Sequence, residues 1–424
     1  MIPKISASTI YSTLGNNSSL IPLGIKDVAN SCGLTTASYI AGDKLEGKDR
    51  FIDEFGTQAI WLGGIPAYKY LLNKTLFKHF NLDAEIDPRL FKDKKIFTLA
   101  KQFAPTKEIK ENLQKAGKQQ KLFKNLAMTK FIASTALTAL TYFGLTKFRH
   151  KYTENQIKKE FIAKQEASKK YNKEVPFSSA FSPVHNSKNV SFTGGIQDFM
   201  FDPVRNLMLV DGAITGERLT HARNPQDFMG YVIKEGSFWL FMYLAGPMIS
   251  KYLEQHAEKT LNKSIDLDAR VIESETLKEA FKNGSLKQHL EAFKANKSNA
   301  EIYKFAVNPE TNNLIIDMAK KSDIITLLKN SNKVDTRKYL DISDLNGVAS
   351  KLEKLLNQYE QSGEDLDTFF KSVRKLKRGS VIKNMGSCIA ALGVIAPIIM
   401  LLVRKLSPNS EYQVKKDVEE QLKS

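Results

Sequence analysis

The chain has 424 residues, a formal net charge of +17 and a hydrophobic fraction of 42%. This apolar content excludes a chain that is disordered by composition, and the length suffices for two or three ordinary domains. The excess of lysine and arginine favours an anionic partner, such as a phospholipid surface, nucleic acid or acidic protein, or else reflects only a lysine-rich surface. The two cysteines, Cys32 and Cys388, exclude a disulfide framework and a C-x-x-C metal or redox pair.

The N-terminal residues 1–23 are polar and lack the continuous apolar stretch of a cleaved signal peptide. A Gly-Ile-x-Asp element follows them and recurs in the middle of the chain. We expect its glycines to lie in turns and its aspartates to cap the helices that follow. The residues concerned are Gly24 and Asp27 in the first copy and Gly195 and Asp198 in the second.

An apolar run follows each copy, over residues 55–72 and residues 236–253. Each run carries a proline, Pro66 in the first and Pro247 in the second. By length, such runs fit a buried core helix, a re-entrant hairpin or a short membrane span. We interpret them as the first apolar helices of two repeats.

An Asp-x-Arg element comes next in each half, Asp87 with Arg89 and Asp268 with Arg270. Aspartate is a favoured N-cap, so we expect these pairs to cap helices and to pair across the repeat interface. A ligand-binding role for them is the alternative.

A second apolar run closes each half, near residues 127–147 and residues 385–403. The later run has no charged residue and the length of a bilayer span, whereas the earlier one reaches that length only if Lys130 and Lys147 snorkel. Small residues spaced four apart, such as Ser134 and Thr138, favour close helix packing in lipid. A soluble bundle with buried Gly/Ala-rich helices is the alternative.

These landmarks recur in the same order, which indicates an internal duplication. The sequence therefore predicts an all-α, duplicated helical membrane protein with about four apolar helices in two parallel repeats. The predicted segments are a polar N-terminal segment (1–23), repeat 1 (24–165), a linker (166–194) and repeat 2 (195–424), with a soluble helical insert at 275–370.

A basic cluster precedes the last apolar run and is the main candidate site for anionic lipid or a protein partner. It consists of Lys371, Arg374, Lys375, Lys377, Arg378 and Lys383. In one interpretation Phe369 and Phe370 dip into the headgroups beside this cluster, and in the other they pack on the core of the insert.

No motif for catalysis, metal binding or phosphate binding is present, and the six histidines are scattered. The sequence predicts no cofactor and no metal, and it favours a protein that is not an enzyme. The apolar runs contain no Asp, Glu, Arg or His, which argues against a proton-coupled transporter.

The stretch Ser-Phe-Thr-Gly-Gly at residues 191–195 resembles a short element near the start of uncharacterised proteins from gut-dwelling, non-photosynthetic relatives of cyanobacteria. The resemblance covers these five residues, implies a bacterial source and a fusion of two once-separate copies, and brings no activity with it.

We expect a structural or scaffolding membrane protein in the bacterial inner membrane, with its basic loops in the cytoplasm. Its expected partners are the lipid bilayer, anionic headgroups and a protein that binds residues 275–370. One alternative is a transporter-like or lipid-handling protein with a site between the repeats. The other is a soluble or peripheral protein that binds nucleic acid through its charge alone.

Overall fold

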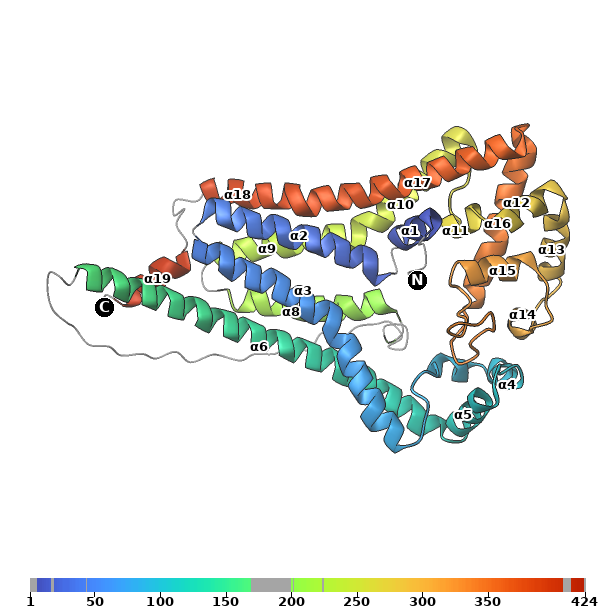
Figure 1. Cartoon of the computed structure of the whole chain (residues 1–424), viewed down its shortest axis with the longest axis horizontal. Coiled ribbons are helices and arrows are strands. Elements are labelled where there is room, and N and C mark those ends of the chain that lie inside the picture. Colours follow the sequence, from blue (N-terminus) through green and yellow to red (C-terminus); the bar gives the residue numbers. More distant parts are fainter. Residues whose placement is uncertain are drawn as a thin grey trace. The chain divides into compact units, whose positions relative to one another are not determined.

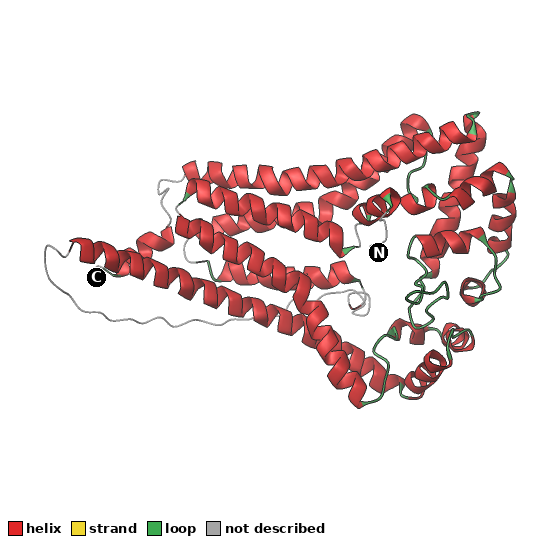
Figure 2. Cartoon of the chain, in the orientation of Figure 1, coloured by secondary structure: helices red, strands yellow, loops and turns green. Residues whose placement is uncertain are grey.

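A computed structural model of the chain describes residues 6–16, 19–42, 44–168, 200, 202–222, 225–406 and 413–422. Every named element in this part of the chain is a helix (Figure 2), and its one extended pairing is an isolated bridge between Leu327 and Val334. The prediction of an all-α fold is confirmed.

The chain forms two compact units, and each takes segments from both predicted repeats. Unit 1 consists of Met1–Pro22, Lys69–Ala133 and Leu244–Ser387, and unit 2 of Leu23–Tyr68, Ser134–Tyr243 and Cys388–Ser424. The units therefore cut across the predicted repeats instead of coinciding with them.

Unit 2 is a bundle of long helices (Figure 1). They are α2 (Leu20–Ala41), α3 (Lys44–Leu72), α6 (Gln120–Ser168) beyond its start, α8 (Pro203–Thr220), α9 (Pro225–Trp239) and α18 (Ala396–Leu406), with α19 (Gln413–Gln421) at the end of the chain. Glycines bring some of these helices into close contact. A Cβ on Gly33 of α2 would overlap the carbonyl oxygen of Gly393, and one on Gly64 of α3 would lie 2.8 Å from Thr138 of α6.

The helices that carry the apolar runs are longer than those runs. The first and second runs lie in α3 and α6, while the third and fourth are interrupted by π-helical turns, Leu240–Leu244 and Ala391–Ile395. Each π turn comes just before a proline, Pro247 and Pro397. Proline lacks an N–H and crowds the preceding turn, and a wider turn there accommodates it.

Among the described residues, two helices are long and apolar enough to cross a membrane, judged by length and composition alone. They are Gln120–Lys164 and the segment Leu366–Val403, which runs from α17 (Leu366–Ala390) into α18. In the described residues the runs at 55–72 and 236–253 do not reach that standard.

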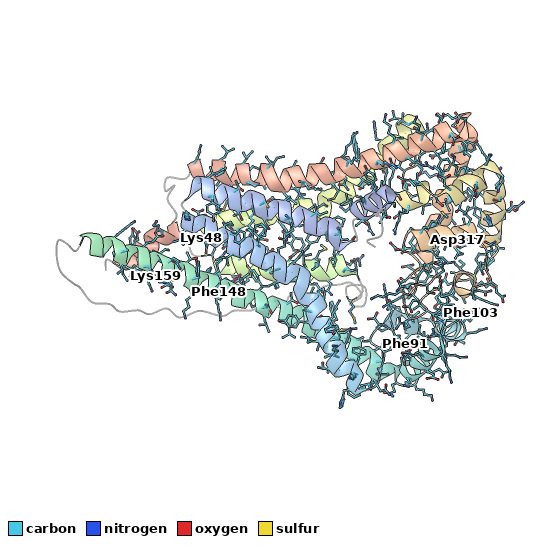
Figure 3. All side chains as sticks on the ribbon, viewed as in Figure 1. Lys48, Phe91, Phe103, Phe148, Lys159 and Asp317 are labelled. Carbon is cyan, nitrogen blue, oxygen red and sulfur yellow. The ribbon has the colours of Figure 1, made fainter. Side chains whose placement is uncertain are left out.

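Unit 1 contains the shorter helices and the predicted insert. Its helices are α1 (Ala7–Gly15), α4 (Lys94–Gln102), α5 (Lys107–Lys118), α10 (Ala245–Leu261), α11 (Ala269–Ile272), α12 (Glu275–Lys282), α13 (Ser285–Lys294), α14 (Asn299–Val307), α15 (Leu314–Lys321), α16 (Ile342–Ser362) and most of α17. Aromatic side chains fill its interior. Phe91 (Figure 3), for example, lies 4.7 Å from Phe97 and 5.6 Å from Phe123 between ring centroids.

Phe369 and Phe370 are fully buried in unit 1. The ring centroids of Phe370 and Phe281 are 5.0 Å apart, and those of Phe369 and Tyr359 are 5.3 Å apart. The interpretation in which they dip into lipid headgroups is therefore wrong, and the alternative, packing on the core of the insert, is confirmed. The two interpretations rest on the same helical pattern, because interfacial and core helices share one apolar stripe.

The expectations for the first Gly-Ile-x-Asp copy are wrong. Gly24 and Asp27 lie inside α2, which begins at Leu20, so neither occupies a turn or a cap. Pro22 stands in the first turn of α2, where its missing N–H costs no helical hydrogen bond. Gly195 and Asp198 of the second copy, and the predicted linker from residue 169 on, lie outside the described residues.

Candidate functional site

Charged side chains gather in the interior of unit 2, and α3 supplies the first of them. Asp49, Arg50, Asp53 and Glu54 fall at the three- and four-residue spacings that place side chains on one helix face. Asp53 and Glu54 are 2% and 4% exposed. This face of α3 therefore presents three carboxylates and one guanidinium to the neighbouring helices.

Arg218 of α8 joins three of these helices. Its guanidinium donates to Glu235 of α9 at 2.6 Å, to Asp53 of α3 at 3.1 Å and to the hydroxyl of Tyr142 on α6 at 2.8 Å. The side chain is 6% exposed. An arginine has five N–H donors in a fixed plane, so it can bridge several acceptors at once.

Arg149 of α6 is the second buried guanidinium. It lies 2.8 Å from Asp53 and 3.8 Å from Asp49, and it donates to the hydroxyl of Tyr231 on α9 at 3.2 Å. Asp49 also accepts a hydrogen bond of 2.6 Å from Thr153 of α6. Asp53 is therefore shared between two arginines from two helices.

Lys234 of α9 completes the set. Its ammonium lies 2.6 Å from Glu54, 3.5 Å from Asp53 and 3.7 Å from Glu235. Four cations thus meet four carboxylates, and we call these eight residues the charge network. Its members are Asp49, Arg50, Asp53, Glu54, Arg149, Arg218, Lys234 and Glu235.

A small cavity of about 20 Å³ lies beside the charge network. That volume has room for one water molecule. Two further aspartates line it, Asp27 of α2 and Asp211 of α8, together with Asn30, Trp61 and members of the network. Tyr243 donates a hydrogen bond to Asp211.

Large apolar side chains are exposed on unit 2 at the level of the charge network, next to exposed lysines such as Lys48 and Lys147. Phe51, next to Arg50, is 50% exposed, and Phe148, next to Arg149 (Figure 3), is 60% exposed. Val232, two residues before Lys234, is 39% exposed. The outer faces of α3, α6 and α9 at this level thus carry large apolar side chains, and those of α3 and α6 also carry exposed lysines.

The structure brings only some of the predicted site residues together. In the basic cluster, Lys377 donates to the carbonyl of Ile265 at 2.7 Å and Arg378 to Glu273 at 2.7 Å, while Arg374 donates to the carbonyl of Ile272. These three hold α17 within unit 1. The other three, Lys371, Lys375 and Lys383, are exposed.

The capping role of the Asp-x-Arg elements is confirmed. Asp87 caps the 3-10 helix Pro88–Lys92 and Asp268 caps α11, each by accepting from the backbone N–H of its own arginine at 2.8 Å. Each arginine also folds back on its aspartate, with side-chain contacts from 2.7 to 3.3 Å. Asp268 also accepts a hydrogen bond of 2.6 Å from Ser12, and Arg270 lies 2.7 Å from Asp323. The expected pairing across the repeat interface is not among these contacts.

A third Asp-x-Arg element, which the sequence analysis missed, has the same geometry. Arg337 donates to Asp335 through Nε and a terminal nitrogen, both at 2.9 Å, and it reaches Asp83 at 3.1 Å. The carbonyl of Arg337 accepts from the N–H of Asp87. The element could have been found by searching for every Asp-x-Arg and not only for those in matched positions.

The charge network was also missed in the sequence analysis, because its residues lie outside the apolar runs. Those runs carry no buried charge, but α3 and α9 begin well before them and α6 continues past residue 147. The aspartates of the adjacent cavity did carry a usable signal, which is a charge in an otherwise weakly polar helix. Lys26 and Asp27 are the only charged residues of α2, and Asp211 stands alone in the sequence Leu-Met-Leu-Val-Asp-Gly-Ala-Ile.

A cavity of about 860 Å³ that is open to solvent lies in unit 1. It lies between α4, α5 and α14, and five lysines line it with a single glutamate, Glu301. The lysines are Lys94, Lys95, Lys101, Lys118 and Lys304. Part of the basic region between the first and second apolar runs therefore forms this groove.

Comparison with family models, with curated proteins and with solved structures finds no match to this chain. The site is therefore interpreted from its own geometry.

Proposed function

We propose that this is a polytopic membrane protein and that unit 2 is its bilayer-embedded part. The supporting observation is the exposure of Phe51, Phe148 and Val232 beside the buried charge network. In water the opposite arrangement is expected, because charged groups are then seldom buried and large apolar ones usually are. The two helices with the length and composition of membrane spans both contribute to this unit.

The charge network supports an internal duplication within this embedded unit. The first helix of each predicted repeat brings an aspartate to the cavity, Asp27 on α2 and Asp211 on α8. The second helix of each brings a glutamate, Glu54 on α3 and Glu235 on α9. Acids on the first and second helices of both repeats are expected if two copies of one unit pack around a common centre, although Asp211 and Glu235 do not stand at the positions that the sequence matches to Asp27 and Glu54.

Among the functions that such a protein could have, the charge network favours transport over scaffolding. A scaffold has no need of buried ions, and a buried ion pair often contributes little or nothing to stability compared with apolar residues of similar volume. Ionisable groups inside a membrane commonly mark the path of an ion or a proton. We therefore propose a transporter-like function in which a proton or small ion passes the network, in the bacterial inner membrane with the basic loops in the cytoplasm.

Membrane embedding is tested by fractionation of cells that express the full chain. We expect the protein to remain in the pellet after alkaline carbonate and to enter solution only with detergent. Recovery of the whole chain in the carbonate supernatant would contradict the proposal. In that case the alternative to test is salt-dependent binding of nucleic acid, with the groove of unit 1 as the basic surface.

Transport is tested with the purified chain in liposomes that enclose either a pH-sensitive or a sodium-sensitive dye. We expect an imposed proton or sodium gradient to collapse faster than in empty liposomes, and D53N to remove most of this difference. The matched control D367N changes an exposed carboxylate of unit 1 and should leave the flux unchanged, since the Asp367 side chain is 77% exposed. If the wild-type protein is folded and embedded but carries neither ion, the transport proposal is contradicted and the scaffolding function is favoured.

A further inference from the structure

The cavity beside the charge network contains an acceptor without a partner. Asn30 Oδ1 is buried and has no hydrogen-bond partner in the described part of the chain, and the whole residue is 2% exposed. Asn30 and Asp27 both line the cavity and stand three residues apart on α2, which places them on one helix face. A buried acceptor of this kind calls for a donor, which an ionised carboxylate cannot supply.

Asp27 and Asp211 also lack a counterion. The four cations of the charge network pair with its four carboxylates, and neither of these aspartates has a cationic nitrogen within 4.0 Å among the described residues. Lys26, although adjacent to Asp27 in sequence, interacts with Cys388 instead. Both aspartates are buried, Asp27 at 8% and Asp211 at 5% exposure.

The groups that face the pair come from every helix around the cavity. Besides the two aspartates these are Asn30 of α2, Glu54 of α3, Arg218 of α8, Lys234 and Glu235 of α9, and Tyr243 of the π turn that follows α9. The two cations among them are already bound to carboxylates. Ionising both aspartates would therefore leave two uncompensated negative charges in one buried place, which is strongly unfavourable.

We propose that Asp27 and Asp211 form a proton-binding site that faces the water-sized cavity and holds at least one proton at neutral pH. The inference rests on the proposed function, for which it names the ion and the residues that bind it. Tyr243 donates to Asp211, so that carboxyl is already served by a donor. The proton is then best placed on Asp27, from which it can be donated to Asn30 Oδ1 or to a water molecule.

Proton exchange at this site needs no further reactant. A hydronium ion in the cavity gives its proton to a carboxylate oxygen and becomes water, and release is the reverse step. Each release adds one negative charge next to Lys234 and Arg218. The pairing of these cations with Glu54 and Glu235 then competes with the new carboxylate, which links proton occupancy to the packing of α3, α8 and α9.

The site is tested by infrared spectroscopy of the purified full chain in detergent, which requires neither transport nor a membrane. We expect the carbonyl band of a protonated carboxylic acid at neutral pH, with loss of at least half of it in D27N, and its disappearance in the double variant D27N/D211N. The control D344N alters an exposed aspartate of α16 and should leave the band unchanged. Absence of the band from the wild type, or an unchanged band in the double variant, would overturn the proposal.

A second measurement uses the wild type alone, in case the variants do not fold. With carbon-13 in the aspartate carboxyl groups, nuclear magnetic resonance resolves which carboxyls still carry a proton at neutral pH. We expect at least one such signal, and a chain in which every aspartate is ionised at neutral pH would reject the site. If the protein proves soluble on fractionation while this signal is present, the proton site stands and the membrane function fails.

Discussion

The two units of the molecule differ in what they bury. In unit 1 the described core consists mainly of leucine, isoleucine, valine, alanine and phenylalanine, and buried polar groups such as Asp335, which accepts from Arg337, are fewer. In unit 2 polar and charged side chains are buried about as often as apolar ones, while large apolar side chains line the outside. A single chain thus follows two opposite rules of burial, as expected if its units fold against different solvents.

The largest expected effect is a loss of stability of unit 2 when a carboxylate in its interior is removed. D53N removes the carboxylate that Arg149 and Arg218 share, and it leaves two buried cations short of charge. We expect unit 2 to lose about 4 kcal/mol of unfolding free energy, because breaking a buried ion pair costs about 3–5 kcal/mol. Chemical unfolding of the full chain in detergent measures it, with D367N as the exposed control. A loss below about 1 kcal/mol, the range of surface pairs, would show that the network is solvated.

The converse test concerns the apolar core of unit 1. F370A deletes a fully buried ring, and we expect a loss of about 3 kcal/mol, at the lower end for Phe→Ala in a core. K371A, at the exposed position next to it, should change stability by less than about 0.5 kcal/mol. Tryptophan fluorescence reports only unit 2, since both Trp61 and Trp239 lie there, so protease resistance of the 275–384 region is the better readout. Equal losses in both variants would refute the packing described for α17.

The next largest expected loss of stability comes from a close helix contact in unit 2. A Cβ on Gly33 meets the backbone oxygen of Gly393, which no side-chain rotation can relieve. We expect G33A to cost about 2 kcal/mol, in the range for overpacking a close contact. G63A is the matched control, because a Cβ there has nothing within 4 Å. Thermal unfolding in detergent should lower the midpoint for G33A only, and similar midpoints would mean that α2 lies further from residue 393.

The Asp-x-Arg caps of unit 1 should each contribute a smaller amount. D87A removes both the cap and the partner of Arg89, and we expect a loss of about 1 kcal/mol, typical of a helix cap. D268A should likewise remove a cap, together with the hydrogen bond that Asp268 accepts from Ser12 of α1. Chemical unfolding compares the two, and a markedly larger loss for one of them would indicate a role beyond capping.

The smallest expected effect depends on pH. Lys338 donates to Glu85 at 2.5 Å, and this hydrogen bond holds the pKa of Glu85 below its ordinary value of 4.5. A lowered pKa in the folded state stabilises the protein above the ordinary value, and that stability is lost as the pH falls through the folded pKa. K338M should therefore flatten the acid side of the pH–stability curve slightly. An unchanged curve would show that the exposed pair contributes nothing measurable.

The sequence predicted those features that are local. The caps at Asp87 and Asp268 followed from one residue type in one position, and the helices of the apolar runs followed from their composition. The charge network depends on residues as far apart as Asp53 and Arg218, brought together by tertiary packing that no local pattern contains. Asp27 shows most clearly how far local patterns can predict a site. The sequence predicts a helix cap there because it places the start of the helix a few positions too late.

The π turn at Leu240–Leu244 bears on the history of the gene. The spacing from Gly236 to Pro247 exceeds that from Gly56 to Pro66 by one residue, and the π turn lies within the longer interval while α3 has none in the shorter. A π turn closes its hydrogen bond one residue later than an α turn, so it absorbs an added residue without rotating the rest of the helix. For the proposed duplication, a single inserted codon in the second copy would explain the difference and leave the helix face beyond Pro247 in register with its counterpart.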